Sequence, residues 1–207
     1  METNSNKDFV IYGHIMTLYR EAKKNSWASI KRSSVFRSLY LSSVLYSFAF
    51  EDVDNPFAIY KFSIDRNGPY EKDVSDALEF LVKDDYLEFE QDGGSDVFRL
   101  GSHPIPEFET AETNEYDWIK LIVDILNIYG EDKIYEFIFR DPEYRRGVQS
   151  DTPKTLTVNP QNESVRFLKQ FEQAFEESIS GANYYDKQEY LKLYFEFLFS
   201  KILNKEI

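Results

Sequence analysis

The chain has 207 residues, a formal net charge of −13, no cysteine and two histidines. This length fits one large domain or two small ones, and the 42% hydrophobic content argues against disorder. Without cysteine there are no disulfides, thiolate metal sites or cysteine nucleophiles. Residues 1–7 are polar, so we expect no secretory signal, and no apolar run approaches the roughly 20 residues that span a bilayer. The composition predicts a soluble, cytoplasmic protein without membrane contact.

Acidic and basic residues are unevenly distributed along the chain. The first 50 residues hold seven Lys or Arg and three Asp or Glu, so the remainder carries all of the acidic excess. A field of that sign repels phosphate backbones, and nucleic acid is expected to bind weakly, if at all. The acidic surface serves solubility or complements a basic partner, and the composition leaves both open.

The first part of the chain predicts two helices followed by a strand. Apolar residues recur at helical spacing over residues 8–24, and Ser33 or Ser34 is expected to cap a second helix that reaches residue 50. Alternating apolar and polar residues over 58–64 predict a strand. Pro69 is then expected near the first position of a third helix.

The third helix has the clearest apolar stripe in the sequence, and a hairpin follows it. Residues 87–90 and 97–100 alternate around a Gly-rich turn, which predicts two paired strands. Two helices, a strand, a helix and a hairpin within residues 1–102 predict a winged-helix-like unit. The stripe itself consists of Val74, Ala77, Leu78, Leu81 and Val82.

The second part of the chain is predicted to be helical. Prolines and acidic residues in 103–114 indicate a linker, and residues 115–207 contain further helical patterns. Within the latter, breakers between 147 and 162 predict a loop. We therefore expect an α+β, mainly α fold: a winged-helix-like unit (1–102), a linker (103–114) and a helical unit (115–207).

The sequence contains no recognisable catalytic signature. It has no paired-histidine zinc motif, no Gly-x-Ser-x-Gly sequence and no phosphate-binding Gly-x-x-x-x-Gly-Lys loop. His14 and His103 lie in unlike contexts and do not suggest a ligand set. Asp117, Glu131 and Lys133 have the residue types of a metal-dependent nuclease, but in helices rather than on adjacent strands. We expect no enzymatic activity, no cofactor and no metal.

The third helix and the hairpin are strongly acidic. A DNA-reading winged helix places the helix before its hairpin in the major groove. Here residues 71–85 hold six acids and two bases, and residues 88–99 hold four acids and one base. This surface repels phosphate and predicts a protein partner, for which Asp73, Asp76 and Glu79 are candidate contacts.

Two further segments are candidate contact sites. Lys23, Lys24, Lys31 and Arg32 surround Trp27, as in a site that binds phosphates and stacks a base. The alternative is a solvated turn between two helices, with Trp27 packed beneath it. The last predicted helix is rich in aromatic residues that serve either the core or a docking surface; the candidates are Tyr190, Tyr194 and Phe197.

Residues 64–87 carry a resemblance to a known family. The turn Gly68-Pro69-Tyr70, the amphipathic helix and the apolar strand resemble the middle components of bacterial ABC-three-component defence systems, including the Lamassu type. Residues 129–134 (Tyr-Gly-Glu-Asp-Lys-Ile) and 139–144 (Phe-Arg-Asp-Pro-Glu-Tyr) look like the second half of that family.

The resemblance implies a non-catalytic adaptor that bridges an SMC-like ATPase and an effector subunit, often a nuclease, in an antiviral complex. Gly68, Pro69 and Tyr70 are then candidate partner contacts. The same turn also occurs in Panacea-type antitoxins. The alternative hypothesis is therefore a stand-alone winged-helix DNA-binding regulator or a Panacea-like antitoxin.

Overall fold

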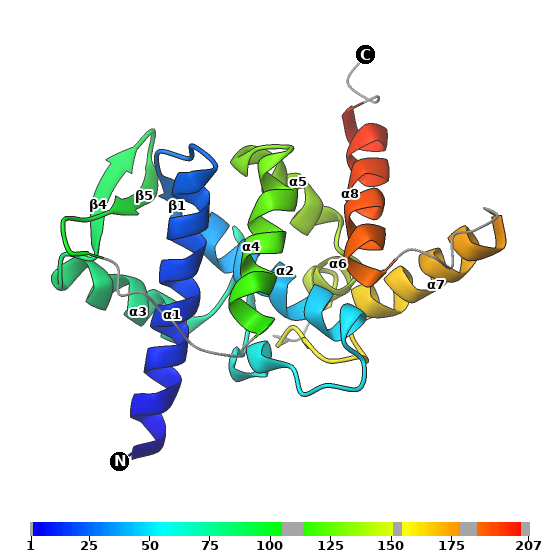
Figure 1. Ribbon diagram of the computed structural model, residues 1–207, viewed down its shortest axis with the longest axis horizontal. Coiled ribbons are helices and arrows are strands. Elements are labelled where there is room, and N and C mark those ends of the chain that lie inside the picture. Colours follow the sequence, from blue (N-terminus) through cyan, green and yellow to red (C-terminus); the bar gives the residue numbers. More distant parts are fainter. Residues whose placement is uncertain (1, 105–113, 151–154, 179–185, 204–207) are drawn as a thin grey trace.

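The computed structural model describes residues 2–104, 114–150, 155–178 and 186–203. The fold is mixed α+β and mainly helical, as predicted (Figure 1). None of the helices in these ranges is both long and apolar enough to cross a membrane. In chain order the elements are α1 (Glu2–Lys24), β1 (Ile30–Lys31), α2 (Arg32–Ala49), the 3-10 helix η1 (Pro56–Ile59), β2 (Ser63–Asp65), β3 (Gly68–Tyr70), α3 (Lys72–Lys83), β4 (Leu87–Asp92), β5 (Ser95–Leu100), α4 (Asn114–Asn127), α5 (Glu131–Arg140), α6 (Pro142–Val148), α7 (Glu163–Ser178) and α8 (Lys187–Leu203).

Helix α2 lies at the centre of the fold. Every residue from 34 to 48 is buried, and α1, α4, α5 and α7 all contact this helix. Two of its buried serines donate to backbone carbonyls: Ser43 to that of Leu39 (2.7 Å) and Ser47 to that of Val158 (2.6 Å). A helix that is buried on all sides must be covered by both parts of the chain.

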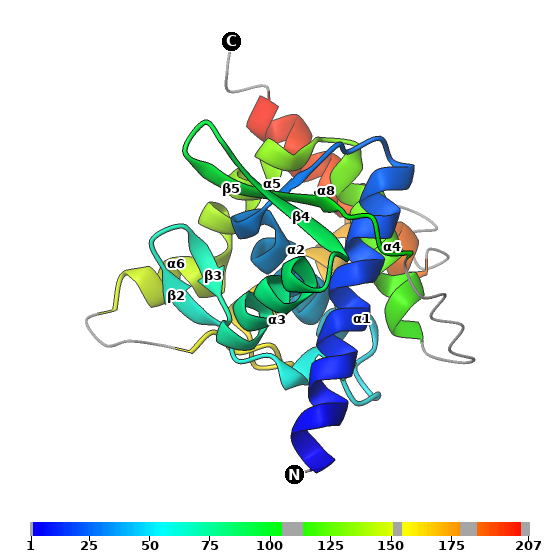
Figure 2. The same cartoon turned by 90° about the vertical axis from the view of Figure 1, so that its left-hand side faces the viewer.

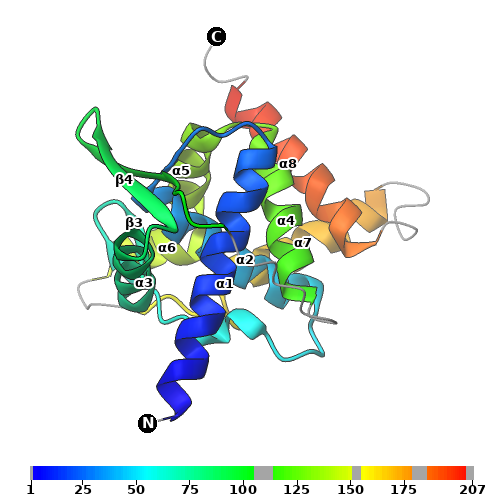
Figure 3. The same cartoon turned by 60° about the vertical axis from the view of Figure 1, so that its left-hand side comes forward.

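The two predicted units share one hydrophobic core. Leu39 and Phe48 of α2 pack in the same cluster as Trp118 of α4 and Val165 of α7. Figure 3 shows α1 and α4 side by side in front of α2. The C-terminal unit is therefore packed against the N-terminal one, as expected. Of the predicted linker, residues 105–113 lie outside the described residues.

A three-stranded antiparallel sheet with the order β1-β5-β4 lies at one end of the molecule (Figure 1). The predicted hairpin is confirmed, since Leu87 pairs with Leu100 and the turn uses positive φ angles at Gly93 and Gly94. The strand β1, which the sequence analysis missed, pairs Ile30 with Phe98. It escaped notice because two residues do not create a period-2 pattern.

The predicted strand over residues 58–64 is largely wrong. Its first part is the 3-10 helix η1, whose start is capped by the Asn55 side chain accepting from the Phe57 N–H (2.9 Å). Phe62 is buried while Lys61 is exposed. The alternation of apolar and polar residues therefore reflects which side chains of this non-strand segment are buried. Only β2 is a strand, and it forms a two-stranded hairpin with β3.

Three predicted helix boundaries also need correction. Pro69 lies in β3 opposite Ile64, and α3 begins later, with Glu71 as its N-cap. The N-cap of α2 is Lys31, which makes no side-chain cap, whereas Ser33 and Ser34 lie inside the first turn. The predicted loop after residue 147 is preceded by a short helix, α6, which a Pro at its first turn initiates.

The start of α6 joins three helices through one buried carboxyl group. Asp141 Oδ1 accepts hydrogen bonds from the Tyr144 N–H (2.8 Å) and from the Tyr40 hydroxyl of α2 (3.1 Å). Its Oδ2 accepts from the Ser164 hydroxyl of α7. Burial raises the pKa of Asp141 to about 6, although these three hydrogen bonds act in the opposite direction.

This raised pKa makes stability depend on pH. The folded state holds a proton on Asp141 more tightly than an unfolded aspartic acid with a pKa of 3.8 does. The contribution is therefore fully present below about pH 4 and is lost as the pH rises through about 6. At about 1.4 kcal/mol per unit, the loss amounts to roughly 3 kcal/mol at most.

We expect the difference in unfolding free energy between the wild type and Asp141→Asn to decrease by 1–3 kcal/mol, at about 1.4 kcal/mol per pKa unit, between pH 4 and pH 7. The asparagine keeps a capping oxygen but does not titrate. Urea unfolding at pH 4, 5.5 and 7 measures this difference. The exposed change Asp117→Asn controls for general effects of charge removal, and a pH-independent difference for Asp141→Asn contradicts the prediction.

Because α2 serves both units, we expect the chain to unfold as one body. Leu39→Ala should lower the unfolding free energy by about 2–5 kcal/mol, since Leu39 is fully buried. Tryptophan fluorescence, which reports on the buried Trp118, and far-ultraviolet circular dichroism should show coincident transitions in both proteins. The exposed change Lys120→Ala is the control. Two separate transitions in the wild type would show that the units are independent.

Candidate functional site

An exposed aromatic cluster lies where α1 meets α3. The rings of Tyr12 and Phe80 are stacked, with centroids 4.9 Å apart, and Phe9 meets Tyr12 edge-on at 6.4 Å. Phe9 is 66% exposed and Phe80 41% exposed, so these rings are not fully covered by the fold. Figure 2 shows α1 and α3 together on the face turned to the viewer. Clustered exposed rings of this kind mark interaction sites more often than isolated ones do.

Carboxylates surround this cluster. Asp76 and Asp84 lie one helical turn to either side of Phe80, at a spacing of four residues, and so share its side of α3. Burial, followed by the charges of Asp8 and Asp84, raises the pKa of Tyr12, which indicates that both carboxylates lie near its hydroxyl. We call this surface the acidic–aromatic face; it consists of Asp8, Phe9, Tyr12, Asp76, Phe80 and Asp84.

The three acids of α3 that the sequence predicted as partner contacts each lie near a basic side chain. Asp73 forms an ion pair with Lys7, Asp76 one with Lys72, and Glu79 lies 3.8 Å from Arg32. All three are at least partly exposed. Surface pairs of this kind contribute little to stability, so their carboxylates remain open to exchange with a partner's cations.

Glu71 does not belong to the surface. It is buried, and its side chain accepts a hydrogen bond from the Val74 N–H (2.9 Å) at the start of α3. One of the acids counted in the sequence is thus a helix cap. The Gly68-Pro69-Tyr70 segment is also mostly internal, since the first two residues are buried and Tyr70 packs on Phe36 with ring centroids 5.2 Å apart.

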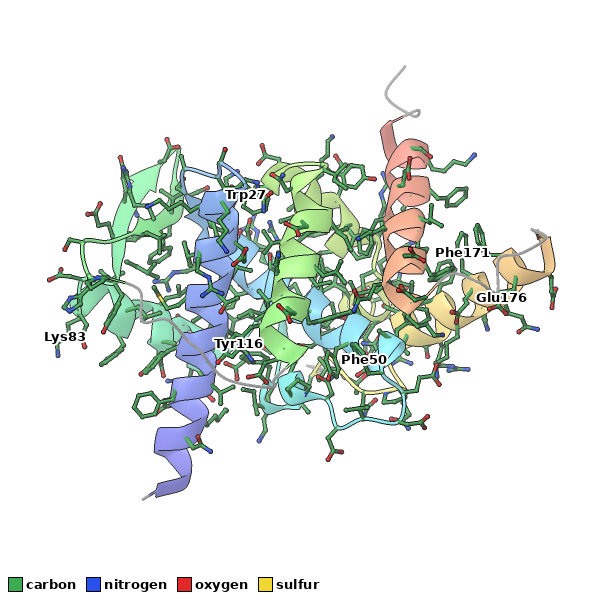
Figure 4. The ribbon with its side chains drawn as sticks, viewed as in Figure 1. Trp27, Phe50, Lys83, Tyr116, Phe171 and Glu176 are labelled. Atoms are coloured by element: carbon green, nitrogen blue, oxygen red, sulfur yellow. The ribbon has the colours of Figure 1, made fainter. Side chains whose placement is uncertain are left out.

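The basic segment is largely engaged within the fold. Lys24 pairs with Glu21 (2.8 Å) and Lys31 with Asp132 (2.6 Å). Trp27 is half-buried and donates to Asn127 of α4 (2.8 Å), between α1 and α4 in Figure 4. These contacts favour the packed turn over a site that stacks a base.

Arg32 and Lys23 differ in availability. Arg32 lies over the Phe98 ring (5.4 Å) and 3.5 Å from Asp96, so its charge is used between α2 and the hairpin. Lys23 is exposed, and within the described ranges it has no ion pair. Among the residues proposed for nucleic acid contact, Lys23 and Lys24 alone present most of their length to solvent.

The aromatic residues of α8 divide between core and surface. Tyr190 and Tyr194 are 4% and 5% exposed, and both pack against Phe171 of α7. They are therefore core residues in this structure, which is one of the two roles that the sequence left open. Phe197 is 44% exposed and remains a candidate surface residue.

The nuclease-like triplet does not converge. Asp117 lies in the first turn of α4, whereas Glu131 begins α5 beyond the other end of α4. The ten residues from Asp117 to the end of α4 span about 15 Å at 1.5 Å per residue. Within the described ranges, no group of three or more His, Cys, Asp or Glu side chains is arranged to hold a metal ion.

The two histidines have separate surroundings. His14 is buried, with Nδ1 at 2.7 Å from the Tyr60 hydroxyl, and its ring contacts Phe57 and Tyr116. His103 is exposed beside the Tyr86 ring. Their environments are those of a packed histidine and a surface histidine.

Sequence reasoning missed the exposure of the acidic–aromatic face. Phe9 and Tyr12 follow the helical spacing of apolar residues in 8–24, which does not distinguish exposed rings from buried ones. The exposure of Phe80 could have been predicted, because Phe80 is not part of the apolar stripe of α3. Comparison of the chain with protein-family models, curated proteins and solved structures finds no match. The site is therefore interpreted from its own geometry.

We expect DNA binding to be no tighter than about 10⁻⁴ M at physiological salt, in the nonspecific range. Any residual binding at low salt should be lost in Lys23→Glu/Lys24→Glu, because these are the accessible cations of the basic segment. Fluorescence anisotropy with a labelled duplex measures both. The matched control is Lys120→Glu/Lys192→Glu, and sequence-specific binding that survives the first pair of changes contradicts the expectation.

Proposed function

We propose that the chain is a non-catalytic adaptor that docks a basic, partly apolar segment of a protein partner on the acidic–aromatic face. The observation that carries the proposal is the stack of exposed Phe80 on partly buried Tyr12, with carboxylates beside it. Burying exposed ring surface contributes about 25 cal/mol per Å², and acids around it attract a cationic partner and set its orientation.

The charge arrangement supports a protein partner rather than DNA. The hairpin β4–β5 presents Glu88 and Asp92 as exposed acids, while Arg99 is paired with Glu90. Phosphates brought to this end of the molecule meet carboxylates, whereas lysine or arginine side chains meet complementary charge. The accessible cations of the basic segment are only two neighbouring residues, Lys23 and Lys24.

The wider proposal follows the family resemblance. The adaptor would act in the cytoplasm between an SMC-like ATPase and an effector subunit of an antiviral defence complex. The element order supports a winged-helix-like first unit, because β1 lies between α1 and α2 and pairs with β5 of the hairpin. The β2–β3 hairpin is then an insertion between α2 and α3.

Charge reversal tests the docking face. The partner is first identified by affinity capture from the native cell and purified. We expect Asp76→Lys/Asp84→Lys to weaken its binding at least tenfold, or about 1.4 kcal/mol. Phe80→Ala should weaken binding by a similar factor through lost ring burial. Isothermal titration calorimetry measures the affinities, and circular dichroism confirms that the variants are folded.

The matched control is Glu176→Lys/Glu177→Lys, which changes the net charge equally at the far end of the molecule. Figure 4 shows Lys83 of α3 and Glu176 of α7 at opposite ends. If both double variants bind equally well, the acidic–aromatic face is not the docking site. A wild-type protein that forms no complex with any protein of its native cell refutes the adaptor function altogether.

A further inference from the structure

A polar cleft with a volume of about 670 Å³ lies on the side of the molecule where the two hairpins face α5. Its walls come from the start of α2, the β2–β3 hairpin, the tip of β4–β5 and the start of α5. These segments are far apart in the sequence, and their convergence builds a space of the size that small ligands occupy. It lies apart from the acidic–aromatic face, and none of the residues of that face lines it.

The cleft contains a buried arginine that forms no salt bridge with the described residues, although the charge of Glu131 acts on it from a longer distance. Arg37 of α2 is 5% exposed, and within the described ranges no carboxylate lies within 4.0 Å of its guanidinium. Its Nη2 and Nε donate to the carbonyl of Asn67 (2.6 and 3.2 Å), and its guanidinium lies over the Tyr135 ring (4.9 Å). Burying an unpaired charge is costly, and an anion bound beside it would offset that cost.

The start of α2 adds a second set of donors. The first turn carries no acidic residue, and the N-cap Lys31 makes no side-chain cap, so its N–H groups and the helix dipole favour an anion. Ser34 lines the cleft and is 1% exposed, yet its hydroxyl oxygen has no hydrogen-bond partner. It lies three residues before Arg37, one turn away on the same side of α2.

Most of the acids around the cleft are already engaged. Asp132 pairs with Lys31 (2.6 Å), and Asp96 lies 3.5 Å from Arg32. Glu131 Oε1 accepts from the Lys31 N–H (2.6 Å), so one carboxylate oxygen already lies beside the start of α2. The contact with Glu131 shows that a carboxylate oxygen fits beside the start of α2. The negative charge of Glu131 also opposes the binding of another anion there.

We propose that this cleft binds the oxoanion group, phosphate or carboxylate, of a small molecule. Arg37 supplies the charge, the Ser34 hydroxyl donates a hydrogen bond, and the N–H groups of the first turn of α2 complete the set. Gly68 allows the β2–β3 hairpin to lie close to Arg37. A Cβ at this position, where φ is +122°, would lie 3.2 Å from Arg37 Nε. The remainder of the cleft holds the rest of the ligand.

Titration of the ¹⁵N-labelled protein with inorganic phosphate and, separately, with acetate tests the proposal. Sodium chloride keeps the ionic strength constant, so general screening does not change. We expect saturable shifts of the Ser33, Ser34 and Gly68 amide signals with a dissociation constant on the order of 1 mM. Saturation with phosphate alone, acetate alone or both identifies the group that the site accepts. Saturation with neither overturns the proposal.

Variants separate a defined site from general attraction. Arg37→Gln should weaken binding at least tenfold and Ser34→Ala several-fold, whereas Glu131→Gln should strengthen it because a competing charge is removed. The control is Arg66→Gln, which changes an exposed arginine between β2 and β3 that does not line the cleft. If Arg66→Gln weakens binding as much as Arg37→Gln does, the proposal is wrong. If Arg37→Gln does not fold, the other two variants test the proposal. Ser34→Ala should weaken anion binding and Glu131→Gln should strengthen it, and the absence of both effects contradicts the proposal.

Discussion

The complete burial of α2 is the constraint on which the rest of this structure depends. A helix with no exposed side needs partners in every direction, and no single unit of the chain supplies them. Helix α1 and the β sheet cover one part, whereas α4, α5 and α7 cover the others. Three of its serines, Ser42, Ser43 and Ser47, avoid the cost of burial by donating to carbonyls. The shared core follows from this helix, and the polar cleft lies at its start.

The charge distribution follows from the same packing. Because α2 begins in a basic stretch and is buried from Ser34 onward, its cations must find partners inside the fold. Lys31 reaches Asp132 of α5, and Arg32 reaches Asp96 of the hairpin. These contacts engage two of the bases that looked available for nucleic acid. Acids at the surface lie beside the partly buried ring of Tyr12 and the exposed ring of Phe80.

Sequence reasoning succeeded where one helix or hairpin carries its own pattern. The stripe of α3 and the turn of β4–β5 are local, and both were predicted. It failed where the decisive partner is distant, since β1 exists only through pairing with β5. It left the role of the α8 aromatic residues open, and of these Tyr190 and Tyr194 are covered by α7. The sequence does not reveal that Arg37 is buried. Its burial depends on Asn67 and Tyr135, which no spacing along the chain relates to it.

The Gly68-Pro69-Tyr70 segment acquires a physical meaning from these contacts. Gly68 is buried with a φ of +122°, which favours glycine, and it lies against Arg37. Tyr70 packs on Phe36, the residue before Arg37. The turn therefore fixes the hairpin that holds a buried guanidinium at the start of α2. The buried part of this turn therefore serves the interior of the fold, as packing beneath the hairpin, rather than an exposed contact surface.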